Sequence, residues 1–452
     1  MGIIIGLLRD WRVWLLGIAA VAMFLIARNS EKVSIKINVK NTIIVVIYLL
    51  AYMINMHFYY TGKFSARTYL IMPIAIAGWA FVATGCTSAY RDIKHEMPFV
   101  SKYTIVSVLI FIVLFLYTLF SYSAQGLIGT LLGGGYYFAI LLVFPIIGYM
   151  IRKGSVDSFL DIFDILSLIW ILMVVMQSIL YARGSQIIPE YLDTQIKFRD
   201  NSLRITLFYG NFAIIHSFYK LYSCKVNTLK KLPYVCICVF GLYGCFFVQL
   251  TRSYTLIVCV CLFIIVLLDK NTSQYKFLRK LLLVIVAVAF ILNTGIVSRF
   301  ISSLSATGAY AGSTYARTYS IAYYWETFKS HFPFGFAFAY EGNYYSLIHG
   351  RGIAYIDDVG IFGQLARLGV FILPIYLWLT VRLIKIWRRI KKGGLQKDYV
   401  FLSAVLVYFL LTSISLICLD PQRILLYPMI IAIYEYTYYE YRLSISTRGN
   451  VA

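Results

Sequence analysis

Long apolar blocks, separated by short polar segments, dominate the pattern of hydrophobic and polar positions along the chain. The blocks are roughly 17–25 residues long, which is the length that an α-helix needs to cross the hydrocarbon core of a bilayer. Backbone polar groups find no partner in lipid, so we expect each block to be helical. The pattern predicts spans at 13–27, 42–56, 68–86, 103–121, 136–151, 159–181, 205–223, 232–250, 253–269, 281–296, 356–384, 398–418 and 424–439.

The charge of the loops predicts how these spans are oriented. The loop at 385–397 carries six Lys and Arg residues, and short basic loops stay on the cytoplasmic side of a membrane. Alternation then places further basic loops on the same side, at 28–40, 91–102, 152–157, 220–231 and 270–280. The outer side receives the loops at 57–67, 122–135, 182–204, 251–252, 297–355 and 420–423.

Composition agrees with this interpretation. Apolar residues make up 61% of the chain and charged residues 13%, against about 25% charged residues in soluble domains. The formal net charge of +22 follows from the basic inner loops, so it requires no nucleic-acid partner. We expect an all-α polytopic integral membrane protein with about 12–13 transmembrane helices among the membrane lipids. Its regions would be membrane helices at 1–200 and 201–296, an outer loop at 297–355 and C-terminal membrane helices at 356–452.

The outer loop at 297–355 is long and rich in aromatic residues, so we expect it to fold and to be partly helical. The segment 315–331 fits a helix parallel to the membrane, with Tyr324, Trp325 and Phe328 on one face. The aromatic rings are either ordinary interfacial packing or a platform for sugars, because an aromatic ring offers an apolar face and a polar tip. The candidates for sugar binding are Tyr324, Trp325, Tyr344 and Tyr345.

Arginines stand at the outer ends of several spans. Arg204 lies in "RITLFYGN", Arg252 in "LTRSYTL" and Arg317 in "ARTYSIAYYWETFKSHFPFG". A guanidinium donates paired hydrogen bonds to phosphate oxygens, so three arginines facing one compartment suit a phosphate or pyrophosphate group. The alternative is that Arg252 anchors a hairpin among the headgroups, while Arg204 and Arg317 are simply solvated.

Groups that could move a proton gather in the segment "HGRGIAYIDDVGIFG". His349 suits a general base because an unperturbed histidine titrates near pH ~6.5. Asp357, Asp358 and, from the outer loop, Glu326 are the carboxylate alternatives. Arg367, two turns into the following span, either pairs with Asp357, Asp358 or another carboxylate, or lines a cavity.

Other chemical signatures are missing from the sequence. There is no GxxxxGK(S/T) or GxGxxG loop, and no spacing of His, Asp and Glu predicts a metal site, so we expect neither a cofactor nor a metal. Both histidines of interest have a structural alternative. A loop histidine such as His349 is more often structural, and His216, inside a span, suits a helix–helix contact.

The order of these segments resembles the O-antigen polymerase and ligase superfamily, the Wzy and WaaL proteins. "RITLFYGNFAI" looks like that family's Arg-containing segment before a helix, and "LTRSYTL" like its Ser/Thr-Arg-Ser turn. "RTYSIAYYWETFKSHFPFGFAF" is similar to the Arg, aromatic helix and Pro-Phe-Gly pattern of its outer loop. The ligase motif is a His and a polar residue, then nine residues, then two Gly separated by two residues. This chain matches it with His349, Gly360 and Gly363, except that Gly350 stands in place of the polar residue. "DDVGIFGQLARLGV" looks more like polymerases.

The resemblance covers roughly residues 200–385 and implies a metal-independent glycosyltransferase of the GT-C type in a bacterial inner membrane. Its active site would face the periplasm, and its donor would be a glycan on undecaprenyl pyrophosphate. The pyrophosphate would be held by Arg204, Arg252, Arg317 and Arg367, and a proton would pass to His349, Asp357, Asp358 or Glu326.

Three functions compete within this frame. A polymerase moves the glycan onto the next lipid-linked repeat unit, and it brings in a polysaccharide chain-length regulator as a partner. A ligase moves the glycan onto lipid A-core. A transporter of lipid-linked sugars would need polar residues throughout the spans, whereas this chain concentrates its charges at the outer face. The acidic pair Asp357–Asp358 before Gly360 then favours the polymerase over the ligase.

Overall fold

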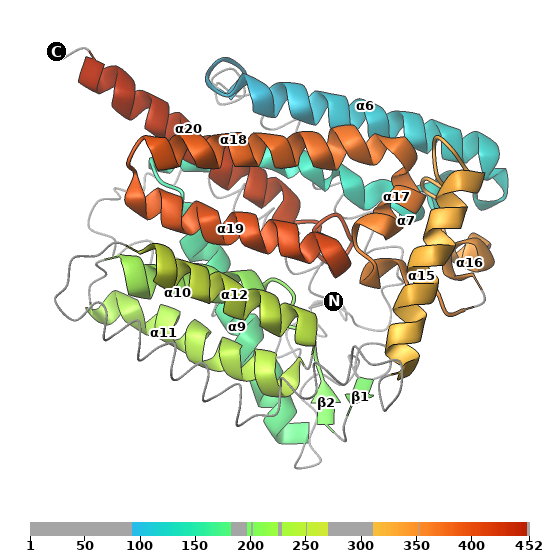
Figure 1. Ribbon diagram of the computed structural model, residues 1–452, viewed down its shortest axis with the longest axis horizontal. Coiled ribbons are helices and arrows are strands. Elements are labelled where there is room, and N and C mark those ends of the chain that lie inside the picture. The colour runs from blue at the N-terminus through green and yellow to red at the C-terminus, as the bar shows by residue number, and fades with distance from the viewer. Residues whose placement is uncertain are drawn as a thin grey trace, which may run out of the picture.

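The computed structural model describes residues 93–181, 197–199, 202–224, 228–249, 251–269, 311–350 and 352–449. Within this part, long helices pack side by side into a bundle, and shorter helices and a small hairpin lie at one of its ends (Figure 1). The spans expected at 13–27, 42–56, 68–86 and 281–296 lie outside the described residues.

Apolar helices build the bundle. Five described stretches are long and apolar enough to cross a membrane, or six if a strongly bent pair counts as one more span. The prediction of an all-α polytopic membrane protein is therefore confirmed for the described residues, apart from one short hairpin. The bundle contains α6 (Pro98–Ser121), α8 (Val143–Lys153), α9 (Asp157–Tyr181), α10 (Gly210–Ser223), α11 (Thr228–Tyr243), α12 (Arg252–Leu268), α18 (Trp378–Lys392), α19 (Gln396–Ser415) and α20 (Leu426–Gly449).

Shorter elements connect these helices. The strands β1 (Lys197–Arg199) and β2 (Ser202–Arg204) form an antiparallel pair in which Lys197 lies opposite Arg204. The other elements outside the bundle are η1 (Ser123–Gln125), α7 (Gly126–Gly134), η2 (Gly135–Leu142), η4 (Gly244–Val248), the longer helix α15 (Ala311–Ser330), α16 (Glu341–His349), η5 (Ile356–Asp358), α17 (Ile361–Leu368), η6 (Gly369–Phe371) and η7 (Leu373–Leu377).

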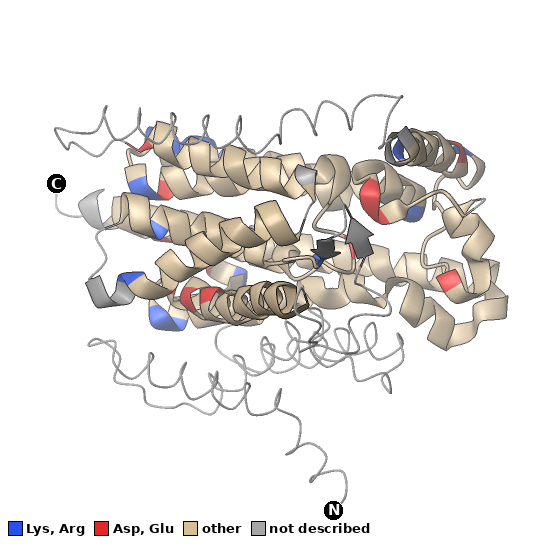
Figure 2. Cartoon of the chain, turned by 90° about the horizontal axis from the view of Figure 1, so that it is seen from below, with Lys and Arg blue, Asp and Glu red and all other residues tan. Residues whose placement is uncertain are grey.

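The described loops lie at the two ends of the bundle, and loops that were expected on the same side of the membrane lie at the same end. Lys220 and Asp157, from loops expected on the inner side, form an ion pair of 2.6 Å at one end. At the other end, Arg204 donates to the Thr251 hydroxyl across 2.9 Å, and both belong to loops expected outside. Charged residues lie mainly towards these two ends, and the middle of the bundle is nearly free of them (Figure 2). Which end faces the cytoplasm stays a prediction from loop charge.

The expectation of one continuous helix over 356–384 is wrong. The stretch is bent by 108° between Ile361–Phe371, which comprises α17 and η6, and Leu373–Lys392. Gly369 adopts a φ of +59°, which a side chain would oppose, and Pro374 follows with no N–H to continue the helix. The break also lets the chain at Gly369 contact the "PFG" segment, because Val370 N–H donates to Pro333 O across 2.9 Å.

The predicted span at 205–223 starts late. Its first five residues are irregular, and α10 begins only at Gly210. Phe208 has a φ of +46°, and this turn is held by the buried side chains of Gln249 and Asn211. The Gln249 Oε1 accepts from Leu207 N–H across 3.1 Å and from Asn211 Nδ2 across 3.2 Å. The segment is therefore shaped by side-chain hydrogen bonds rather than by helix propensity.

The outer loop does contain a helix, since α15 covers nearly the whole segment predicted as helical. It runs across the end of the bundle, steeply inclined to α18 and α19 (Figure 1). The buried face of α15 carries Tyr324 together with Ser320 and Thr327. Trp325 remains 44% exposed, so the expectation that it shares one face with Tyr324 is wrong.

His216 makes the helix–helix contact expected of it. Its Nδ1 lies 2.8 Å from Oδ2 of Asp164, which joins α10 to α9 inside the bundle. Ser217 donates to the same carboxylate oxygen across 3.2 Å. A continuous apolar core surrounds this polar contact and extends through α6, α8, α19 and α20. These contacts stabilise the half of the bundle that ends at Asp157 and Lys220.

Candidate active site

A buried ion pair forms the centre of the candidate site, in the loop that joins α19 to α20. Arg423 donates from Nη1 to Oδ2 of Asp420 across 2.5 Å, and both side chains are buried. The Nε of Arg423 donates to the hydroxyl of Tyr254 in the first turn of α12. One arginine therefore ties the loop at 416–425 to the start of α12, where the "LTRSYTL" segment lies.

Gln364 on α17 joins this ion pair to a second element. Its Nε2 donates to Oδ1 of Asp420 across 3.0 Å, and its Oε1 accepts from the Tyr137 hydroxyl across 2.5 Å. Both oxygens of Asp420 are thus paired, and the Gln364 side chain is fully buried. Buried polar groups that are all satisfied hold neighbouring elements in one geometry, so this network fixes α17 against η2 and the 416–425 loop.

Arg367, one turn after Gln364, is less completely paired. Its guanidinium is buried, donates to the Tyr136 hydroxyl and lies 5.6 Å from the Phe336 ring. Among the described residues no carboxylate is within ion-pair distance of it, and its Nε has no hydrogen-bond partner. A buried cation without a counter-ion is costly, so this position suits an anion that arrives with the substrate.

The two adjacent aspartates have different surroundings. Asp357 is partly buried, and burial raises the pKa of its carboxyl, while the positive charges of Arg423 and Arg367 lower it in part. Asp358 is exposed. Because the two carboxyls diverge, they do not form a paired metal cage. Asp357 faces the arginines, and Asp358 borders the surface.

His349 makes a hydrogen bond through one ring nitrogen and an ion-pair contact through the other. Its Nδ1 lies 3.0 Å from the Ala354 carbonyl oxygen, which can only accept, so Nδ1 carries a proton. Its Nε2 lies 2.9 Å from Oε1 of Glu341, and this carboxylate raises the pKa of His349 above the ordinary value. The Glu341 carboxylate thus stabilises the charged form of the ring. The side chain also fixes the turn that follows α16.

Arg204 brings two of the predicted motifs together. Its Nε donates to the Gln249 carbonyl across 3.2 Å and its Nη2 to the Thr251 hydroxyl across 2.9 Å. The "RITLFYGN" and "LTRSYTL" segments therefore meet at one end of the bundle. Arg252 is the first residue of α12, and its side chain lies outside the described part of the structure.

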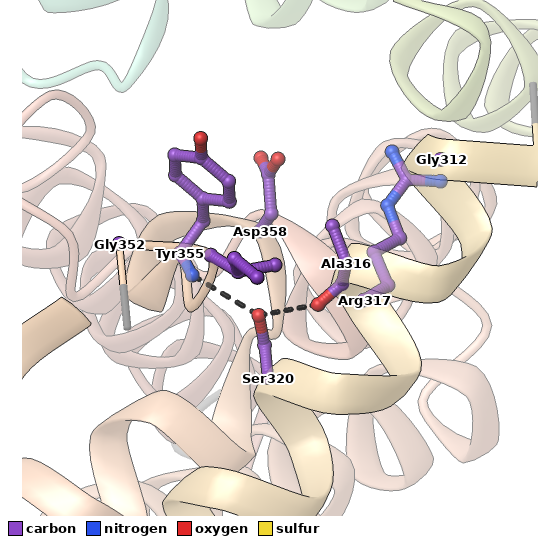
Figure 3. A pocket seen from close by; sticks show the side chains of 8 residues that line it. Gly312, Ala316, Arg317, Ser320, Gly352, Tyr355 and Asp358 are labelled. Atoms are coloured by element: carbon purple, nitrogen blue, oxygen red, sulfur yellow. Dashed lines mark hydrogen bonds between the residues drawn. The ribbon is translucent and has the colours of Figure 1, made fainter. Parts of the chain in front are cut away.

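The remaining charged candidates lie on α15 and at the surface. Arg317 is exposed, and it lines a pocket together with Asp358 (Figure 3). Glu326 is exposed and pairs with Lys329 across 2.6 Å on the same helix. Asp357 is thus close enough to Arg367 and Arg423 for their charges to lower its pKa, whereas Arg317 and Glu326 lie apart from the buried network.

The four aromatic candidates occupy different environments. Tyr324 is buried, and its hydroxyl donates to the Ile348 carbonyl across 2.7 Å, so it joins α15 to α16 and has no free face for a sugar. Tyr344 packs against Tyr122 at 5.0 Å between ring centroids. Trp325 stays exposed beside Phe328. The other exposed candidate, Tyr345, is 55% exposed and lies 4.7 Å from the His349 ring.

The sequence interpretation missed most of the buried network. It placed 420–423 in an outer loop but did not single out Asp420 or Arg423, although "LDPQR" is a charged pair inside an apolar run. That isolated pair of charges was an available signal. Tyrosines are common throughout this chain, so nothing in the local sequence marks the ones that take part. The missed members are Tyr136, Tyr137, Tyr254, Gln364, Asp420 and Arg423.

Protein-family models find no match in this chain, and no curated protein matches it. The resemblance to O-antigen polymerases and ligases is thus carried by the motifs alone. A functional assignment has to be supported by the geometry of the site and by direct experiment.

Proposed function

We propose that the chain is a membrane-embedded glycosyltransferase that polymerises a surface polysaccharide. It would transfer a glycan from undecaprenyl pyrophosphate onto the next lipid-linked repeat unit, at the periplasmic face of the bacterial inner membrane. The observation that carries the proposal is the buried guanidinium of Arg367, which lacks a carboxylate partner among the described residues. It lies at the end of a bundle of membrane-length helices, where a lipid pyrophosphate could supply the missing negative charge.

The residues suit a direct displacement at the anomeric carbon. The acceptor hydroxyl oxygen forms the new bond to that carbon while the bond to the pyrophosphate oxygen breaks. The pyrophosphate leaves with the electron pair, and the guanidinium of Arg367 stabilises the negative charge that develops there. Arg204, whose guanidinium donates to the Gln249 carbonyl and the Thr251 hydroxyl, is the second candidate for this group.

Asp357 is the proton acceptor in this scheme. Burial raises the pKa of its carboxyl, which strengthens it as a base, and the charges of Arg423 and Arg367 limit that rise. The hydroxyl proton passes to Asp357 as the new glycosidic bond forms. His349 keeps the following turn in place through Ala354 and does not take the proton.

A ligase is the second candidate, because the spacing of His349, Gly360 and Gly363 matches the ligase motif. The same residues would then serve a different acceptor, lipid A-core. If this histidine were the base of a ligase, it would have to give up its ion-pair contact with Glu341 at 2.9 Å, whereas Asp357 has no such contact to lose among the described residues. We therefore place the polymerase first.

Purified full-length protein in proteoliposomes would separate these functions. With lipid-linked repeat units alone, we expect a ladder of longer glycans. Arg367→Gln should reduce the rate of ladder formation by about 100-fold or more, as loss of a transition-state donor does. Arg388→Gln, an exposed arginine at the far end of α18, is the matched control and should leave the ladder unchanged.

The alternatives give different products. Transfer that appears only when lipid A-core is added would establish the ligase instead. If neither acceptor yields a product and lipid-linked sugar crosses between the leaflets, the protein is a transporter. An undiminished ladder from Arg367→Gln would remove this arginine from the mechanism.

A further inference from the structure

A pocket of about 360 Å³ opens between α15 and the turn that precedes α17. Its lining includes Arg317 and Ser320 from α15, and Gly352, Tyr355 and Asp358 from the turn. Figure 3 shows the carboxylate of Asp358 between the Tyr355 ring and the guanidinium of Arg317. Small-molecule sites occupy roughly 300–1,000 Å³, and this volume is near the lower limit of that range, which suits one or two sugar rings.

Hydrogen bonds fix the shape of this pocket. The Ser320 hydroxyl donates to the Ala316 carbonyl across 2.6 Å and accepts from the Tyr355 N–H across 3.0 Å (Figure 3). The carbonyl of His349 accepts from Gly352 N–H across 2.9 Å, which closes the turn. The wall that carries Tyr355 and Asp358 is therefore held against α15 before any ligand binds. A preformed site loses less conformational entropy on binding.

The charges of the pocket argue for a polyhydroxyl ligand. Arg317 and Asp358 carry opposite charges at one opening, yet no ion pair joins these two exposed side chains. The carboxylate can accept hydrogen bonds from neighbouring hydroxyls, and the guanidinium can donate to hydroxyl or ring oxygens. A phosphate at the same place would be repelled by Asp358. This chemistry separates the pocket from the Arg367 position, which offers a cation alone.

Tyr355 supplies the apolar contact that a sugar ring needs. Its side chain is 49% exposed, and it belongs to the pocket lining. An exposed phenol ring presents a flat apolar face with a polar tip, which matches the alternation of C–H and O–H groups on a pyranose. Of the four aromatic residues chosen from the sequence, Tyr324 and Tyr344 are packed against other residues, and the exposed Trp325 and Tyr345 do not line this pocket.

We propose that this pocket binds one pyranose ring of the acceptor repeat unit. The assignment rests on the proposed glycosyl transfer, because Asp358 is adjacent to Asp357, the residue that takes the proton from the attacking hydroxyl. A ring held by Arg317, Asp358 and Tyr355 would occupy the pocket beside η5, the short helix that also carries Asp357. Arg317 accordingly contacts sugar and not pyrophosphate, which revises the role that its motif implies.

Binding measured without turnover tests the proposal. The full-length protein in lipid nanodiscs is titrated with two probes, followed by saturation-transfer NMR and equilibrium dialysis. The first probe is the free repeat-unit oligosaccharide, released from the host polysaccharide by mild acid hydrolysis, with no lipid or phosphate. The second is geranylgeranyl pyrophosphate, which has no sugar.

We expect Asp358→Asn, Arg317→Gln and Tyr355→Ala each to weaken oligosaccharide binding by about tenfold or more. The same variants should bind geranylgeranyl pyrophosphate as the wild type does, and Arg367→Gln should show the reverse pattern. Lys329→Gln is the matched control, since Lys329 is exposed on the same helix but does not line the pocket. It should bind both probes normally.

The outcomes distinguish the two proposals. Normal oligosaccharide binding by Asp358→Asn and Arg317→Gln, with pyrophosphate binding lost in Arg367→Gln, overturns the sugar site and leaves the proposed function standing. Loss of pyrophosphate binding in Asp358→Asn or Arg317→Gln would show that the pocket holds phosphate, which also overturns the sugar site. If wild-type protein binds neither probe, the proposed function fails and the sugar site fails with it.

Discussion

The guanidinium of Arg423 and the carboxylate of Asp420 are 2.5 Å apart inside a loop, with neither side chain open to solvent. Removing one partner of a buried ion pair leaves the other charge uncompensated, which costs about 3–5 kcal/mol. We expect Asp420→Asn or Arg423→Gln to lower the free energy of unfolding by about that amount. Thermal unfolding of the purified protein in detergent micelles measures the effect.

Two controls accompany this prediction. Replacing both residues together, as Asp420→Leu with Arg423→Met, should recover much of the lost stability, because no lone charge remains. Lys329→Gln breaks an exposed pair with Glu326 and should cost at most about 1 kcal/mol. An unchanged unfolding midpoint for Asp420→Asn would show that this pair does not stabilise the loop.

The pKa of Asp357 predicts a pH dependence of activity. Burial raises this pKa above the ordinary carboxyl value, and a base must be deprotonated to act. Activity should therefore fall as the pH drops through the raised pKa, at a higher pH than an ordinary carboxyl would give. Asp357→Asn should lose about 100-fold or more of kcat. The pH profile of kcat/KM measures the position of the acidic limb.

A neighbouring charge provides a check on that assignment. The negative charge of Asp358 raises the pKa of Asp357, so Asp358→Asn should move the acidic limb to lower pH. Asp357→Glu should restore part of the activity that Asp357→Asn loses. If the acidic limb of the kcat/KM profile stays at the same pH in Asp358→Asn, a residue other than Asp357 is the base.

The contact between His349 and Glu341 makes stability depend on pH. Glu341 raises the pKa of His349, and His349 lowers the pKa of Glu341. The histidine contribution is complete below the ordinary imidazole pKa and is lost as the pH rises through the raised value. The glutamate contribution is complete above the ordinary carboxyl pKa and is lost as the pH falls through the lowered value.

The contact is therefore most stabilising between the lowered carboxyl pKa and the raised imidazole pKa. Because the Glu341 side chain is 60% exposed, the gain should be at most about 1 kcal/mol. Glu341→Gln should lower the unfolding midpoint at mildly acidic pH and converge with the wild type at alkaline pH. A difference that stays constant over the whole pH range would rule out an ion pair as its cause.

Gly369 should tolerate no side chain. A Cβ there would lie 1.9 Å from the Pro333 carbonyl oxygen, and the φ of +59° already disfavours other residues. We expect Gly369→Ala to cost about 2–4 kcal/mol. Gly312→Ala is the matched control, since open space surrounds Gly312 in α15 and alanine favours helix. Equal unfolding midpoints for the two variants would contradict the close contact.

Hydropathy alone was sufficient to locate much of the bundle. The spans predicted at 103–121, 159–181 and 398–418 coincide closely with α6, α9 and α19, because membrane-length helices require nothing beyond a run of apolar residues. The break after α17 was missed for the same reason. Hydropathy does not distinguish a straight helix from one bent at Gly369 and Pro374 when both are apolar.

The candidate site could be predicted only in part. Arg204 and "LTRSYTL" were expected at the same end, and the structure places them in contact. The pairing of Tyr137 with Gln364 could not be foreseen, because 227 positions separate them and neither has a distinctive local pattern. Burial of the aromatic candidates could not be predicted either. Tyr324 and Tyr345 look alike in sequence, yet Tyr324 is buried and Tyr345 keeps an exposed ring.

The bend of 108° changes how a membrane-bound substrate could approach the site. In a straight span, Gln364 and Arg367 would be stacked along the membrane normal, at depths set by helical rise. With a bend of 108° between Ile361–Phe371 and Leu373–Lys392, the two side chains are no longer stacked along the axis of α18. A polyprenyl chain could then stay within its leaflet and slide in sideways until its pyrophosphate meets Arg367, without lifting the headgroup or dragging it into the hydrocarbon.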